Sequence, residues 1–251
     1  TSTGVYFCHD CGAGGHIGRL VGNHASTSSS RPPLTPARQV RDPKSVKANR
    51  HYEEVLVQAV RGGPTDKYLS NRRIKYESWC DLQDSLKENE WKDDFEITTY
   101  PFRNKDGEIV SVQRGFIAKE KADEAAKLDR RLYCGPKSQG VSILFDAPKV
   151  IVAEGLETGL SVRQYLGNDH GLIICGDAGN LASLAHTNSW AISKRKKVIV
   201  AADNDPANKG IEAAREVFNK LSHKVLIFMP AMPGYDWNDV LKKGNMDREW
   251  I

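Results

Sequence analysis

Short apolar runs alternate with longer segments of helical periodicity over the carboxyl-terminal part of the chain. The apolar runs predict strands at 149–153, 171–175, 197–202 and 224–229. The segments between and after them predict helices at 156–167, 179–187, 208–222 and 237–243. Strands that alternate with helices are typical of a parallel sheet with helices on both faces. Because these strands are apolar throughout, we expect the sheet to be buried on both sides, in an α/β fold.

The preceding part of the chain mixes helical and strand patterns. A short helix is predicted at 52–60 and a strand at 141–145. Residues 97–102 and 108–117 predict a β-hairpin, because the Asp-Gly pair between them supplies the positive φ angles of a tight turn. Residues 119–131 form either a helix or an ordered loop. The pattern as a whole predicts a smaller α+β domain before the α/β domain.

Composition divides the chain further. Residues 1–25 are rich in Gly, Cys and His, and residues 26–48 are rich in Ser and Pro without periodicity. The second composition is typical of a flexible linker. The two predicted folded domains then cover 49–147, which is basic, and 148–251.

Charge and cysteine content narrow the function classes only slightly. The chain has 251 residues, with 36 Lys and Arg against 32 Asp and Glu, a net charge of +4. This mild excess permits a nucleic-acid partner without demonstrating one. No apolar run approaches the roughly 20 residues of a membrane-spanning helix, so we expect no membrane partner. The five cysteines show no disulfide framework, which favours a cytoplasmic protein.

Acidic residues follow two of the predicted strands directly. Glu154 follows 149–153, and Asp203 and Asp205 follow 197–202. The carboxyl ends of parallel strands meet at one edge of a sheet, where ligands bind. Carboxylates gathered there repel one another, and oxygen ligands favour Mg²⁺ or Mn²⁺. Each Asp alone is equally explained as a helix N-cap, but their joint occurrence at strand ends favours a metal site.

Four strings in this region resemble the Toprim domain. They are VAEGLETGLS at 152–161, DAGNLA at 177–182, VAADNDPA at 200–207 and GYDWNDVL at 234–241. Toprim domains occur in DnaG-type primases, type IA and type II topoisomerases, OLD-family nucleases and RecR-type repair proteins. The wider match is closer to the Toprim primases of phages and plasmids.

The resemblance implies a role for each acid. Glu154 corresponds to the family's catalytic Glu, as an acid/base or metal-associated carboxylate, and Asp203 and Asp205 correspond to the metal-binding pair. Three further acids are secondary candidates, for the outer part of the site or, in the last two cases, for capping the last helix: Glu157, Asp236 and Asp239.

Residues 4–21 resemble the second half of a primase zinc ribbon, with Cys8 and Cys11 as its C-x-x-C pair. In that family a first ligand pair lies upstream, and none precedes Cys8 here. Because tetrahedral zinc takes four ligands, these two cysteines are either ligands in an improvised zinc site or free thiols. The chain is either a fragment of a longer protein, which we favour, or its ribbon has degenerated.

The segment between ribbon and Toprim domain also resembles the corresponding part of phage and plasmid primases. It carries a group of bases shortly before the acids, which we predict to bind phosphate: Arg114, Lys119, Lys121, Arg130, Arg131 and Lys137. Arginine can hold a phosphate through two parallel hydrogen bonds. Because acidic residues are interspersed among these bases, a solvated face of mixed charge is the alternative.

The resemblance implies a DNA primase, a nucleotidyltransferase that makes short primers from nucleoside triphosphates on single-stranded DNA. A divalent metal held by Glu154, Asp203 and Asp205 would be its cofactor, and a replicative helicase its expected partner, in the same chain or another. A metal-dependent nuclease built on the same acids and a non-catalytic nucleic-acid-binding module are the alternatives.

Overall fold

The computed structural model of the protein describes residues 5–7, 14–16, 57–82, 85–221 and 225–244. Its contacts divide the chain into two compact units, Thr1–Asp42 and Pro43–Ile251. In the first unit, β1 (Val5–Phe7) pairs antiparallel with β2 (Gly14–His16).

Several predictions for the amino-terminal part fall on undescribed residues. Cys8, Cys11 and the linker predicted at 26–48 lie outside the described residues. Zinc binding by the two thiols therefore stays a prediction, as does the flexible linker.

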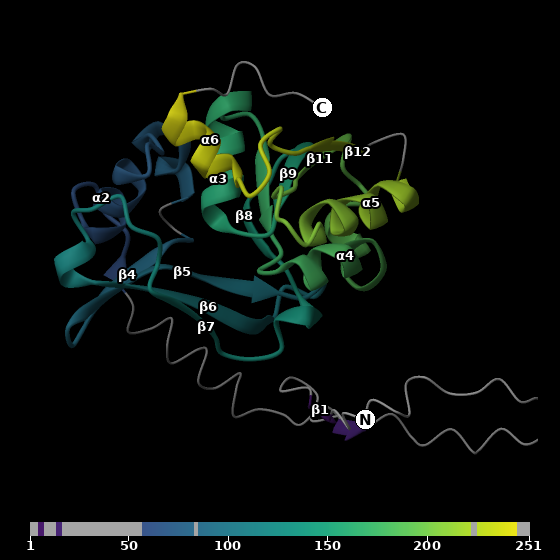
Figure 1. The fold of residues 1–251 in the computed structure, drawn as a ribbon, viewed down its shortest axis with the longest axis horizontal. Coiled ribbons are helices and arrows are strands. Elements are labelled where there is room, and N and C mark those ends of the chain that lie inside the picture. Colours follow the sequence, from purple (N-terminus) through teal and green to yellow (C-terminus); the bar gives the residue numbers. More distant parts are fainter. Residues whose placement is uncertain (1–4, 8–13, 17–56, 83–84, 222–224, 245–251) are drawn as a thin grey trace, which may run out of the picture. The chain divides into compact units, whose positions relative to one another are not determined.

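The second unit contains the predicted parallel sheet (Figure 1). Its strands lie in the order β12 (Val225–Phe228), β11 (Lys197–Ala201), β9 (Lys149–Ala153), β10 (Gly171–Ile174) and β8 (Ser142–Phe145). The first four strands are parallel to one another. β8 is antiparallel to β10 and forms one edge, so the strand predicted at 141–145 belongs to this sheet.

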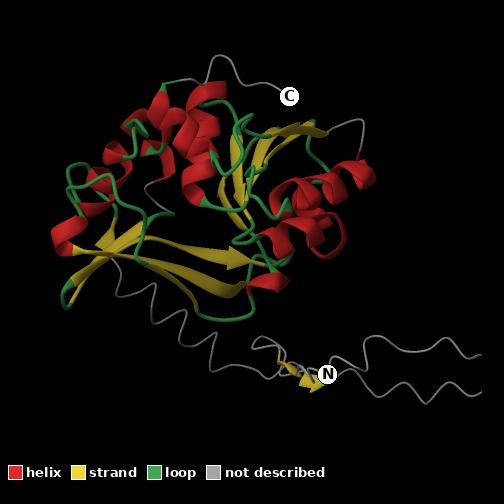
Figure 2. Ribbon diagram, in the orientation of Figure 1, coloured by secondary structure: helices red, strands yellow, loops and turns green. Residues whose placement is uncertain are grey.

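Helices cover both faces of this sheet (Figure 2). They are α3 (Leu156–Leu166) and α6 (Trp237–Lys243) on one face, and α4 (Ala178–Thr187) and α5 (Lys209–Leu221) on the other. Successive residues of β9 serve opposite faces: Ile151 lies in the same core cluster as Leu160 of α3, and Val152 in the same cluster as Val217 of α5. This explains why the strand is apolar throughout, and the predicted α/β architecture is confirmed.

An antiparallel sheet precedes it along the chain. Its strands are β3 (Val57–Gln58), β4 (Lys87–Trp91), β5 (Asp94–Arg103), β6 (Ile109–Ala118) and β7 (Arg130–Tyr133), in sequence order. β5 and β6 form the predicted hairpin, and Gly107 in its turn has a φ of 79°. The sheet is accompanied by α2 (Pro64–Asn71) and by 3₁₀ turns at Tyr76–Ser78 and Cys80–Leu82.

Two local expectations for this part need correction or completion. The helix predicted at 52–60 is wrong where the chain is described, because Val57 and Gln58 pair with β4 and take their backbone hydrogen bonds from a sheet. Residues 119–131 begin with a 3₁₀ turn at Lys119–Lys121 and continue as a loop into β7. None of the helices among the described residues is long and apolar enough to cross a membrane.

The two sheets share one packed core and are joined by buried polar contacts. Tyr68 of α2 and Trp79 lie in the same cluster as Ile151. The guanidinium of Arg163 on α3 is fully buried, and its Nη2 donates to Asp81 at 2.6 Å. Asp81 belongs to the 3₁₀ turn at Cys80–Leu82, in the part of the chain that carries the antiparallel sheet. The position of the antiparallel sheet against the parallel one is therefore set by specific contacts as well as by apolar packing.

Close packing of α3 on the parallel sheet predicts a sharp difference between two glycines. A Cβ at Gly159 would lie 2.6 Å from Leu172 Cδ1 and 3.1 Å from Ile174 Cδ1, whereas one at Gly179 would meet only Asp177 Oδ1 at 3.4 Å. We expect Gly159→Val to lower the free energy of unfolding by about 1–3 kcal/mol through overpacking. The matched control Gly179→Val should change it by less than about 0.5 kcal/mol. Urea denaturation measures both, and equal effects would contradict the assigned packing of α3.

Candidate active site

Parallel register brings acidic residues from separate parts of the chain to one edge of the sheet. Ala153 of β9 pairs with Ala201 of β11, so Glu154 and Asp203 follow at the same end. Asp205 follows two residues after Asp203. The two groups of acids predicted from the sequence therefore lie at one sheet edge.

The neighbouring strands bring two more carboxylates to this edge. Ile174 of β10 pairs with Ala153, and Asp177 follows it. Phe228 of β12 pairs with Ala201, and its following loop leads to Asp236. In the sequence Asp236 was a secondary candidate, whereas Asp177 was not assigned to the site at all.

Asp177 is not predicted from the sequence because Cys175 and Gly176 separate it from the end of β10, whereas Glu154 follows its strand directly. Its side chain accepts a hydrogen bond from the Asn180 backbone N–H at 2.7 Å and so caps α4. Its other oxygen lies 2.6 Å from Lys137 Nζ. The sequence signal that identifies Asp177 as a candidate is its position shortly after β10, the strand that pairs with the one preceding Glu154.

The electrostatics of Glu154 and Asp203 show that these acids influence one another. Burial raises the pKa of Glu154, and the negative charges of Asp177 and Asp205 raise it further. Burial also raises the pKa of Asp203 to about 7, with further contributions from Asp236 and Glu154. Repulsion of this kind is expected where several carboxylates share one low-dielectric region without a cation.

Thr158, in the first turn of α3, contacts one of these acids directly. Its Oγ1 donates to Asp203 Oδ1 at 3.1 Å, which opposes the rise in the pKa of Asp203. The hydroxyl thereby ties the helix that follows β9 to the loop that follows β11. The sequence analysis did not predict this contact, although Thr158 lies in the first turn of the helix that follows Glu154.

Asp205 differs from Asp203 in its surroundings. Burial favours the neutral acid, but backbone N–H groups at the start of α5 outweigh it and lower the pKa of Asp205. Gly210 N donates to Oδ2 at 2.8 Å and Ala207 N to Oδ1 at 3.0 Å. Asp205 therefore orders the beginning of α5 while its carboxyl stays ionised, and its role as a metal ligand stays a prediction.

Asp236 and Asp239 form the cap of α6. Asp236 accepts from the Asp239 backbone N–H at 2.8 Å, and the Asp239 side chain accepts in return from the Asp236 N–H at 3.5 Å. Lys127 Nζ lies 3.3 Å from Asp236 Oδ2. Asp236 thus caps a helix and, through its charge on Asp203, also belongs to the acidic edge.

Glu157 connects the acidic edge to the antiparallel part of the protein. Its carboxylate accepts from Tyr68 Oη of α2 at 2.5 Å and from Arg131 Nη2 of β7 at 2.8 Å. Burial favours the neutral acid, but the Arg131 charge and the Tyr68 hydrogen bond lower the pKa of Glu157. This side chain is therefore engaged in joining the two sheets.

The six predicted phosphate-binding bases do not lie on one surface. Arg131 and Tyr133 of β7 face the parallel sheet, since Arg131 binds Glu157 and Tyr133 Oη donates to Gly176 O at 2.8 Å. Lys137 also lies on this side, beside Asp177. Arg130, which alternates with Arg131 along the strand, points to the opposite face of the sheet, and its guanidinium lies 4.3 Å from the Phe116 ring centroid.

The remaining bases also have acidic partners. Arg114 forms two hydrogen bonds of 2.8 Å with the buried Glu96, on the same face as Phe116. The other pairs are Arg130 with Asp94, Lys119 with Glu90, and Lys121 with Asp129. The structure thus brings only Arg131 and Lys137 to acids of the candidate site, and phosphate binding by any of the six stays a prediction.

The donor set suits a hard divalent cation. Every side chain that defines the edge offers carboxylate oxygens, the ligands that Mg²⁺ and Mn²⁺ prefer. As they stand, no three Asp, Glu, His or Cys side chains in the described part of the chain form a group that would hold a metal ion. The raised pKa values of Glu154 and Asp203 are the observation that fits a cation, because its charge would relieve their repulsion.

Comparisons with known proteins agree with this architecture. Residues 149–246 match the family model of the Toprim domain, so the predicted Toprim domain is confirmed. No curated protein matches the sequence significantly.

Among solved structures, the chain is similar to the primase fragment of the bacteriophage T7 primase-helicase protein, with a TM-score of 0.53 and 18% identity over 79% of this chain and 82% of that one. The RNA polymerase domain of Mycobacterium tuberculosis primase DnaG follows at 0.47 and 15%, covering 80% and 79%. The Aquifex aeolicus primase fragment follows at 0.46 and 13%, covering 81% and 58%. Of these three, only the T7 fragment exceeds a TM-score of 0.5, and at this identity it shows a shared fold.

The pKa of Asp203 predicts a specific pH dependence of stability in metal-free buffer. Its value of about 7 in the folded protein lies above its ordinary value of 3.8, so the folded state binds the proton more tightly than the unfolded state. The free energy of unfolding should therefore fall as the pH rises from about 4 to about 7. Asp203→Asn should reduce this fall, while Asp106→Asn in the exposed hairpin turn should not. Denaturation with EDTA across this range measures it, and identical pH profiles for wild type and Asp203→Asn would contradict the assigned environment.

The bridge made by Glu157 predicts a cost for its removal. We expect Glu157→Gln to lower the free energy of unfolding by about 1–2 kcal/mol, because it removes the charge that Arg131 and Tyr68 face. The partial exposure of Arg131 limits the loss. Tyr68→Phe, which removes only one hydrogen bond, should cost less. Thermal and urea denaturation compare the two, and a neutral Glu157→Gln would show that the bridge contributes nothing to docking of the sheets.

Proposed function

Because residues 149–246 form a Toprim domain, we propose that the protein is a primase-type nucleotidyltransferase that makes short primers on single-stranded DNA. The observation that carries the proposal is the acidic edge itself. Parallel strands bring Glu154 and Asp203 to one sheet edge, where the charge of Glu154 contributes to the raised pKa of Asp203. The fold shared with the T7 primase fragment supports the same conclusion.

In this proposal Asp203, Asp205 and Glu154 hold Mg²⁺ or Mn²⁺. The ion, when bound, neutralises negative charge that develops on the transferred phosphoryl group. Asp203 remains attached to Thr158 through one carboxylate oxygen. Asp205 accepts from the backbone N–H groups of Ala207 and of Gly210 in α5, so both side chains already have hydrogen-bond partners in the absence of an ion.

Glu154 has the properties of a proton acceptor for the primer 3′-hydroxyl. Burial is the largest cause of its raised pKa and persists when a cation relieves the repulsion between the acids. A base works best when its pKa approaches the working pH. The carboxylate would accept the hydroxyl proton as the oxygen attacks the α-phosphorus of the incoming triphosphate and pyrophosphate leaves.

Arg131 and Lys137 are the bases placed to receive phosphate groups near this edge. Each is now paired with an acid, Arg131 with Glu157 at 2.8 Å and Lys137 with Asp177 at 2.6 Å. A triphosphate or template strand would share these cations with their present partners. The similar T7 fragment belongs to a primase-helicase protein, which supports a replicative helicase as a partner of this chain as well.

Primer synthesis on single-stranded templates, with all four nucleoside triphosphates and Mg²⁺ or Mn²⁺, tests the proposal. We expect Asp203→Asn and Glu154→Gln each to reduce primer synthesis by about 10²- to 10³-fold, because each removes a charge needed in the transition state. Binding of single-stranded DNA should stay close to that of wild type. Asp106→Asn, an equal charge change in the exposed turn of the hairpin, is the control.

The same assay separates the alternatives. Cleavage of labelled DNA with Mn²⁺ and without triphosphates, lost in Asp203→Asn, would replace the primase by a nuclease. Full primer synthesis by both site variants would remove the acidic edge from the reaction.

A further inference from the structure

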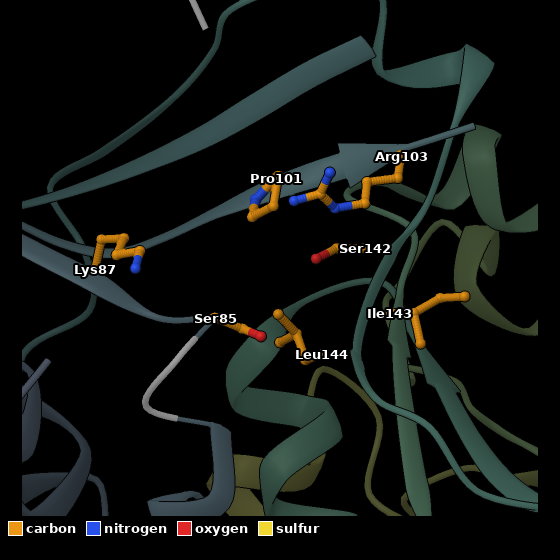
Figure 3. A pocket seen from close by; sticks show the side chains of 7 residues that line it. All are labelled: Ser85, Lys87, Pro101, Arg103, Ser142, Ile143 and Leu144. Carbon is orange, nitrogen blue, oxygen red and sulfur yellow. The ribbon is translucent and has the colours of Figure 1, made fainter. Parts of the chain in front are cut away.

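A cavity lies where β5 exchanges its pairing with β4 for a bridge to the residue before β8. Thr99 of β5 pairs with Lys87 of β4, whereas Arg103 forms a bridge with Val141, just before β8. Pro101, between them, has no N–H group to donate to a neighbouring strand. A cavity of about 250 Å³ opens at this gap, bounded by β4, β5 and β8 (Figure 3).

The cavity is lined by hydrogen-bond donors and positive charge. Lys87 and Arg103 supply two cations, and Ser85 and Ser142 supply two hydroxyl groups, while Leu144 contributes an apolar wall. None of the described residues that line it carries a carboxylate.

Two of these groups lack a partner within the described part of the chain. Ser142 is only 1% exposed, and its hydroxyl has no hydrogen-bond partner there; its oxygen points into the cavity in Figure 3. Lys87 Nζ likewise has no ion-pair partner among the described residues. Arg103 donates to Gly107 O at 3.0 Å. The hydroxyl of Ser142 can therefore donate to an acceptor that enters the cavity.

We propose that this cavity binds a phosphate group, either of a free nucleotide or of a nucleic-acid backbone. A phosphate offers only acceptors and negative charge, the complement of a lysine, an arginine and two hydroxyls. The inference needs no metal and involves none of the acids assigned to the active site, so it goes beyond the proposed function and can fail independently of it.

Isothermal titration of the full chain tests the proposal, with EDTA present so that no metal holds phosphate at the acidic edge. The two probes are AMP and an oligodeoxythymidylate without terminal phosphates. We expect saturable binding of at least one probe, weakened about tenfold by Lys87→Gln and severalfold by Ser142→Ala, since each removes a hydrogen bond to a charged group. Lys105→Gln, the same charge change in the exposed hairpin turn, should leave binding unchanged.

The pattern of binding identifies the source of the phosphate. Binding of AMP that depends on Lys87 and Ser142 assigns the cavity to a free nucleotide, and binding of the oligonucleotide alone with the same dependence assigns it to a backbone phosphate. The proposal is overturned if wild type binds neither probe, or if Lys87→Gln and Ser142→Ala, with unfolding midpoints like wild type, bind both probes as wild type does.

Discussion

Repulsion between carboxylates at one edge of a buried parallel sheet is the constraint on which the account depends. The sheet is held together by apolar side chains on both faces, and its register leaves no choice about where the residues after each strand lie. Glu154 and Asp203 are thereby held in a partly buried region, where burial and neighbouring negative charges raise the pKa of both: Asp177 and Asp205 act on Glu154, and Asp236 and Glu154 act on Asp203. Such an arrangement lowers the free energy of unfolding, and carboxyl groups with perturbed pKa values are typical of binding and catalytic sites.

The acids at this edge differ in their hydrogen-bond partners. Asp177, Asp205 and Asp236 direct carboxylate oxygens to the backbone N–H groups of the helices that follow them. Asp203 instead has the hydroxyl of Thr158. The helix caps fix the backbone around the edge, and the less compensated acids, Asp203 and Glu154, are the ones whose pKa values rise. The same loops thus cap helices and carry the acids for which we propose a metal-binding role.

The parallel sheet was predictable from the sequence almost element by element, because apolar strands and amphipathic helices alternate there without interruption. The strand at 149–153 and the helix at 237–243 begin and end as predicted. The acids at strand ends followed from the same pattern. The helix predicted at 52–60 failed because Val57 pairs with β4, a long-range contact that local periodicity does not contain. The partners of Arg114 and Arg130 were unpredictable for the same reason: Glu96 and Asp94 become neighbours only through strand pairing.

Binding of Mn²⁺ to the full chain, followed by electron paramagnetic resonance of the free ion, tests the central claim most directly. The account predicts saturable binding by wild type that is greatly weakened in Asp203→Asn and unaffected by Asp106→Asn. Absence of saturable binding, or equal binding by wild type and Asp203→Asn, would contradict the claim that this sheet edge gathers its acids around a divalent cation.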